Sequence, residues 1–163
     1  MQIPVCHPHV LQPFQEITAI DLQLTSTLTR SVTGLQIQYT LSGQIDQVLL
    51  PALKSTPCRR DHLWQTTCFE FFIAMPGSPQ YWEINFAPSG AWNVYVFTGY
   101  RQGMREEAVL TSLSSTQSHK AGRYQLMLDF PLADLIALDP VSYTHLRAHE
   151  TADVISYAVF CLK

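Results

Sequence analysis

The sequence predicts an all-β protein that folds as an antiparallel β-sandwich. Short segments in which apolar and polar residues alternate recur along the chain, and turns that contain Pro or Gly separate them. Helical periodicity is almost absent. Many short strands joined by turns are typical of sandwiches and barrels, and the length of the chain before residue 141 suits a single hydrophobic core.

The first third of the chain contains two predicted strands. Apolar residues alternate with polar ones over residues 20–25, and again over the longer segment 34–43, GLQIQYTLSG. Residues 29–33 are predicted to form a polar turn between them. Residues 54–62, which include a proline and two adjacent arginines, are predicted to be a loop.

Three dense strands are predicted at the centre of the chain. They span residues 67–74, 80–87 and 91–98. The segments between them contain Pro and Gly, which break strands and supply turn geometry. A weaker edge strand is predicted at 109–113, a further alternating strand at 122–130, and one turn of helix at 131–135.

The three central strands divide into two sets of side chains, because successive side chains of a strand point to opposite faces. One set is wholly apolar and is predicted to be the core: Phe69, Phe71, Ile73, Trp82, Ile84, Phe86, Trp92, Val94 and Val96. The other set mixes carboxylates, amides and aromatic rings: Cys68, Glu70, Phe72, Tyr81, Glu83, Asn85, Asn93, Tyr95 and Phe97. Carboxylates and amides bond to hydroxyl groups, and aromatic rings pack against the C–H side of a sugar. The alternative is a merely solvated face, which sandwiches commonly have.

The candidate ligand-binding residues lie on this mixed face and in the loops beside it. They are Glu70, Tyr81, Glu83, Asn85, Asn93 and Tyr95, with Trp64, Tyr100 and Arg101 from flanking loops. Arg101 is the candidate to anchor an anionic group. Glu70 and Glu83 are also candidates for the acid and base of a glycoside hydrolase, but cross-strand neighbours meet the required separation of about 5 to 10 Å too easily for it to be evidence. We therefore expect a non-catalytic protein.

Composition restricts the partners and the compartment. The net charge is −3 and no basic cluster is visible, which argues against nucleic acid. The N-terminus lacks the features of a secretion signal, and no apolar run approaches the roughly 18 residues that span a bilayer, so a cytoplasmic protein without a membrane partner is expected. The cysteines before residue 141 do not suggest a disulfide framework, and Cys6, His7 and His9 are too few for a metal site.

Several motifs of the central region follow a recognisable pattern. They are Trp64, Cys68-Phe-Glu70, Glu83, Asn85-Phe, Pro88-Ser-Gly90, Trp92 and Tyr100-Arg101. This pattern resembles the DOMON-like bacterial proteins related to the family 9 carbohydrate-binding modules, over roughly residues 17–138 and most closely over residues 63–104. The resemblance implies a sandwich of the jelly-roll type that binds sugar in relatives, or haem in other DOMON domains. Haem would require axial ligands such as His62, Met75 or Met104. A protein-interaction domain is the remaining alternative.

The segment from residue 141 to residue 163 is interpreted as translated sequencing-adapter sequence. VSYTHLRAHET resembles a translated transposon adapter, and ISYAVFCL resembles the flow-cell primer that follows such an adapter. The alternative is an ordinary helix that carries His145 and His149, followed by an apolar strand. The predicted organisation is a partly ordered segment at 1–16, a DOMON-like sandwich at 17–140 that is truncated at its C-terminus, and the adapter-derived segment at 141–163.

Overall fold

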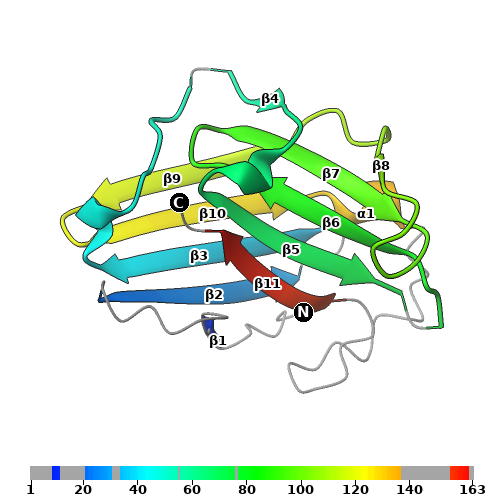
Figure 1. Cartoon of the computed structure of the whole chain (residues 1–163), viewed down its shortest axis with the longest axis horizontal. Coiled ribbons are helices and arrows are strands. Elements are labelled where there is room, and N and C mark those ends of the chain that lie inside the picture. Colours follow the sequence, from blue (N-terminus) through cyan, green and yellow to red (C-terminus); the bar gives the residue numbers. More distant parts are fainter. Residues whose placement is uncertain are drawn as a thin grey trace.

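The structure is a computed structural model, and its described part is an all-β sandwich of two facing sheets (Figure 1). It describes residues 9–11, 21–30, 34–54, 56–75 and 77–136, together with the backbone of residues 155–161. The predicted fold class is confirmed. No helix among these residues is long and apolar enough to cross a membrane.

The first sheet is antiparallel throughout. Its strand order is β1 (His9–Leu11), β2 (Leu22–Arg30), β3 (Leu35–Gly43), β10 (Arg123–Phe130) and β9 (Ser114–Lys120). The strands β2 and β3 pair over their whole length, and β10 pairs with β3 from Arg123 opposite Ser42 to Phe130 opposite Leu35. This long register brings the alternating apolar residues of all three strands onto one face.

The second sheet carries the three dense strands that the sequence predicts. Its order is β11 (Ile155–Cys161), β5 (Cys68–Ala74), β6 (Tyr81–Phe86), β7 (Ala91–Phe97) and β4 (Cys58–Arg59), and β8 (Arg105–Glu106) also pairs with β7. The strand β4 runs parallel to β7, whereas the other pairs are antiparallel. Three short helical segments complete the described residues: η1 (Ile45–Gln47), η2 (Leu63–Gln65) and α1 (Leu132–Leu135).

The core lies between the two sheets. All nine residues of the apolar set from β5, β6 and β7 are buried there, as the alternation predicts. They pack against the alternating apolar residues of the first sheet, which include Tyr39 and Tyr124. The Phe69 ring lies 5.1 Å from the Tyr39 ring and 5.8 Å from the Tyr124 ring. The Tyr39 hydroxyl donates a hydrogen bond to the carbonyl oxygen of Glu70 at 2.9 Å, which ties the two sheets together.

Three predictions of element position are wrong. No strand forms at residues 109–113, and β9 begins one residue later and extends to Lys120. Its sequence, SSTQSHK, has no apolar alternation, because β9 is an exposed edge strand that pairs with β10 through its backbone. The predicted loop at 54–62 contains β4, and the first predicted strand continues beyond residue 25 into the first two residues of the expected turn, ending at Arg30.

The two terminal segments lie mostly outside the described residues. Residues 1–8 and 12–20 are outside them, and His9–Leu11 pair with β2. Residues 137–154 are also outside, so the His145 and His149 pair has no structural description. The strand β11 pairs with β5. The interpretation of residues 141–163 as adapter sequence stays a prediction.

Glu107 anchors the segment after β8 to the core. Its carboxylate accepts a hydrogen bond from Trp82 Nε1 at 3.0 Å and another from the Val109 backbone N–H at 3.2 Å. Replacing Glu107 with alanine is expected to lower the free energy of unfolding by about 1–3 kcal/mol, because the buried indole N–H loses its acceptor. Urea denaturation of Glu107→Ala and Glu107→Gln checks this, since glutamine keeps an acceptor oxygen. Equal losses in the two variants would contradict the explanation.

Candidate functional site

The outer face is the surface of the second sheet that points away from the core. The register of β5, β6 and β7 sets its mixed side chains in cross-strand rows. Glu70 lies opposite Asn85, which lies opposite Asn93. The next row contains Phe72, Glu83 and Tyr95. A further row contains Tyr81 opposite Phe97. The structure therefore brings together on one face the six sheet residues that the sequence singles out, as the alternation predicts.

Most of these residues are not exposed. Asn85 and Asn93 are 0% exposed, Tyr95 is 2% exposed and Glu70 is 6% exposed. The expectation of an open polar face is therefore wrong for these four side chains. A ligand on the outer face would meet the residues that cover and surround them.

The cover over one end of the outer face comes from η2 and the residues before it. Leu63 is buried in a small apolar cluster with Cys68, Ala87 and Ala91, which anchors η2 on the sheet. This anchored segment places Asp61, His62 and Trp64 over this end of the face, with Asp61 and Trp64 against Tyr95.

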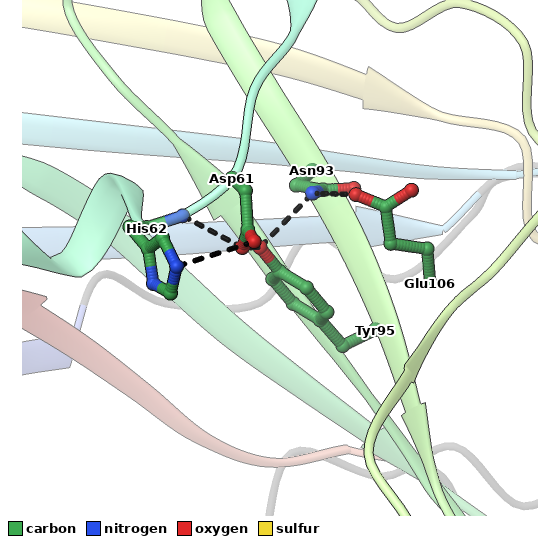
Figure 2. A network of polar contacts seen from close by, with 5 residues as sticks. All are labelled: Asp61, His62, Asn93, Tyr95 and Glu106. Atoms are coloured by element: carbon green, nitrogen blue, oxygen red, sulfur yellow. Dashed lines mark hydrogen bonds and ion pairs between the residues drawn. The ribbon is translucent and has the colours of Figure 1, made fainter.

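A chain of hydrogen bonds connects this cover to the sheet (Figure 2). The Tyr95 hydroxyl donates to Asp61 Oδ1 at 2.5 Å, and Asn93 Nδ2 donates to the Tyr95 hydroxyl at 2.9 Å and to Glu106 Oε1 at 2.8 Å. The His62 backbone N–H donates to Asp61 Oδ1 at 2.8 Å, and His62 Nε2 lies 3.3 Å from Asp61 Oδ2. These bonds fix the orientation of Asp61 and Glu106 relative to the sheet.

The same contacts set the protonation states of Asp61 and Tyr95. The hydrogen bond from Tyr95, followed by that from the His62 backbone, lowers the pKa of the Asp61 carboxyl. Burial first, and then the neighbouring Asp61 carboxylate, raise the pKa of the Tyr95 hydroxyl. At neutral pH Asp61 is therefore an ionised, half-exposed acceptor, and Tyr95 is a protonated, buried donor.

Trp64 and Glu83 are the two candidate residues that remain partly accessible beside this network. The Trp64 ring meets the Tyr95 ring edge-on at 5.6 Å and the His62 ring edge-on at 4.9 Å. Glu83 lies next to Tyr95 across the strands and accepts a hydrogen bond from Asn85 Nδ2 at 2.9 Å. Partial burial raises the pKa of Glu83, and the bond from Asn85 opposes this effect.

The other end of the outer face is aromatic. Tyr81 stacks on Phe97 with ring centroids 4.6 Å apart, and its ring lies 6.2 Å from that of Phe72. The Tyr81 hydroxyl accepts a hydrogen bond from the Arg101 backbone N–H at 3.2 Å. Tyr100 is 80% exposed, with the Arg101 guanidinium 5.5 Å from its ring. The loop that contains Tyr100 and Arg101 therefore presents both side chains to solvent, and the hydrogen bond to Tyr81 ties this loop to the sheet.

The structure thus separates the predicted site residues by accessibility. Trp64, Tyr81 and Glu83 are half-buried, and Tyr100 and Arg101 are exposed, so these five can contact a ligand. The remaining four, Glu70, Asn85, Asn93 and Tyr95, are buried. Asp61 and Glu106 were missed because no alternation marks these loop and edge residues, and His62 was singled out only as a possible haem ligand.

The residues that the sequence offers as haem ligands do not form a group. His62 contacts Asp61, whereas Met75 and Met104 are surface residues that are 40% and 51% exposed. Within the described ranges, no group of three or more His, Cys, Asp or Glu side chains is arranged to hold a metal ion.

Comparisons with known proteins support the fold. No family model and no curated protein matches the sequence significantly. The structure is similar to that of a proposed carbohydrate-binding protein from Bacteroides uniformis, with a TM-score of 0.63 and 11% sequence identity. The similarity covers 82% of this chain and 64% of that protein, so the chain spans just under two thirds of its neighbour. At this identity the likeness establishes a shared β-sandwich architecture.

Proposed function

We propose that this protein is a non-catalytic binding module whose ligand is a carbohydrate or a related polyol. The observation that carries the proposal is the position of Glu83. This carboxyl is half-buried in the outer face, next to Tyr95, while the Trp64 ring contacts Tyr95 from the cover. A hydrogen-bonding group beside an accessible aromatic ring is the combination that recognises a sugar.

The surrounding acceptors suit a ligand with several hydroxyl groups. Asp61 and Glu106 are exposed carboxylates that the network with Tyr95 and Asn93 holds in place. Together with Glu83 they offer acceptor oxygens from three separate segments. Preorganised acceptors bind a ligand at a lower entropic cost than mobile ones.

One further observation supports carbohydrate as the ligand class, and another supports a non-catalytic role. The structural neighbour from Bacteroides uniformis is itself a proposed carbohydrate-binding protein. Glu70 is 6% exposed, so the pair Glu70 and Glu83 does not present two accessible carboxyls to a glycosidic bond. The motifs of the central region resemble those of the DOMON-like sandwiches related to family 9 carbohydrate-binding modules, and we propose that the chain belongs with them.

Trp64 provides the most direct test. Isothermal titration of the full chain with a panel of neutral monosaccharides and oligosaccharides is expected to give saturable binding by at least one sugar. Trp64→Ala should weaken that binding about tenfold, which is about 1.4 kcal/mol, because the ligand loses an aromatic packing surface. Leu49→Ala, which removes a 64% exposed apolar side chain elsewhere, is the control.

The two variants decide the outcome together. Weakening in Trp64→Ala alone supports the site. Folded wild-type protein that binds no sugar in the panel would contradict the proposed ligand class, and equal weakening in Leu49→Ala would place the binding elsewhere.

A further inference from the structure

A pocket lies at the edge of the sandwich, where β4 and β9 are outer strands of their sheets. Its volume is about 380 Å³. The residues that line it are Pro57, Arg59, Trp92, Thr111, Ser112, Leu113, Ser114 and Ser115. None of the residues that line this edge pocket is a candidate residue of the proposed carbohydrate site, although Arg59 contacts Asn93 of the outer face.

Arg59 is held rigidly at this pocket. Its guanidinium carbon lies 4.4 Å from the centre of the Trp92 ring. Nη1 donates to Asn93 Oδ1 at 2.6 Å, and Nη2 donates to the carbonyl oxygens of Glu107 at 2.8 Å and Leu110 at 2.5 Å. All three acceptors are neutral, and a guanidinium has five N–H donors. Arg59 therefore keeps its positive charge and further donor capacity.

No carboxylate neutralises this charge at close range within the described residues. Arg59 forms no ion pair there. The nearby acidic side chains are engaged in other contacts: Glu106 accepts from Asn93, and Glu107 accepts from Trp82. Among the residues that line the edge pocket, Arg59 is the one charged side chain. A half-buried charge usually has a counter-charge, so the pocket favours an anion.

The rest of the lining supplies hydroxyl donors. Four of the lining residues, Thr111, Ser112, Ser114 and Ser115, carry a hydroxyl group. Guanidinium and hydroxyl groups are the donors that bind phosphate, sulfate and carboxylate oxygens. We propose that the edge pocket is a second ligand site, which binds a small anionic group of this kind. This inference does not depend on the proposed carbohydrate-binding function.

Titration of the full chain with inorganic phosphate tests the proposal. Isothermal titration and the midpoint of thermal unfolding are recorded at constant ionic strength, with sodium chloride as the non-specific control. Saturable binding and a rise in the midpoint are expected, because an anion that binds only the folded state stabilises it. Parallel titrations with sulfate and acetate distinguish a tetrahedral oxyanion from a carboxylate.

Three variants locate the binding. Arg59→Gln is expected to abolish it, and Ser114→Ala with Ser115→Ala should weaken it about tenfold while leaving the contacts of Arg59 intact. Arg60→Gln, which removes the exposed neighbouring arginine, should bind like the wild type.

The outcomes are decisive even where Arg59→Gln fails to fold, since the serine double variant then decides alone. Binding that is lost or weakened in the pocket variants and kept in Arg60→Gln supports the site. A folded wild-type protein without phosphate, sulfate or acetate binding overturns it, as does a serine double variant with unchanged affinity.

Discussion

Replacing Phe69 with alanine is expected to lower the free energy of unfolding by about 3–5 kcal/mol, which is the usual cost of removing a buried phenylalanine ring. Phe69 is 1% exposed and lies on β5. It contacts Tyr39 and Tyr124, which belong to two strands of the opposite sheet. The vacated volume lies between two sheets whose backbones are held by long hydrogen-bonded registers, so collapse around it is restricted. A loss of this size is a large part of the stability of an ordinary domain.

Chemical denaturation of Phe69→Ala and Phe72→Ala compares the loss in the free energy of unfolding on the two faces of one strand. Phe72 lies three residues further along β5, on the outer face, and is half-buried. Its replacement is expected to cost clearly less, because it removes less contact with buried atoms. Similar losses in both variants would mean that the outer face is packed as closely as the core, and would contradict the sandwich interior described above.

The central strands could be predicted from the sequence because each has one face in the core and one face away from it, and its residues alternate regularly between the two. Phe69, Ile84 and Val94 belong to segments in which every second residue is buried in one core, so period two appears directly in the residue types. The strands β3 and β10 follow the same rule. The strand β9 does not, because both of its faces are largely exposed and its place depends on backbone pairing with β10.

The candidate site could be predicted only in part. Alternation correctly assigns Glu83 and Tyr95 to one face, because it depends on local backbone geometry. It does not reveal whether another segment covers that face. The fold of η2 back over the sheet buries Tyr95 and places Asp61 beside it, and this packing involves residues 34 positions apart in the chain. Periodicity within a strand contains no information on such contacts.

Glu83→Gln is expected to stabilise the protein at neutral pH. Burial raises the pKa of Glu83 in the folded state above its ordinary value of 4.5. A carboxyl with a raised folded-state pKa contributes its full stability below the unfolded pKa, and this contribution is lost as pH rises through the folded pKa. Glutamine can accept the hydrogen bond from Asn85 without a buried charge, so it avoids this loss. The stability gain should therefore shrink as pH falls towards 4.

Urea denaturation at several pH values measures this gain, with Asp46→Asn as the control. Asp46 is an exposed carboxylate in η1, and its replacement should give no comparable pH-dependent gain. A Glu83→Gln variant that is destabilised equally at every pH would contradict the prediction, because the expected gain depends on ionisation of the half-buried carboxyl.

The same substitution is expected to weaken sugar binding about tenfold to a hundredfold, because a hydrogen bond to a charged group contributes about 1.5–3 kcal/mol. Titration of Glu83→Gln with the sugar that the wild type binds measures this loss. A structural residue that only supports the fold would lose affinity and stability together. A gain in stability with a loss of affinity would instead show that the carboxylate is retained for its ligand, at a cost to the fold. Unchanged affinity would remove Glu83 from the site.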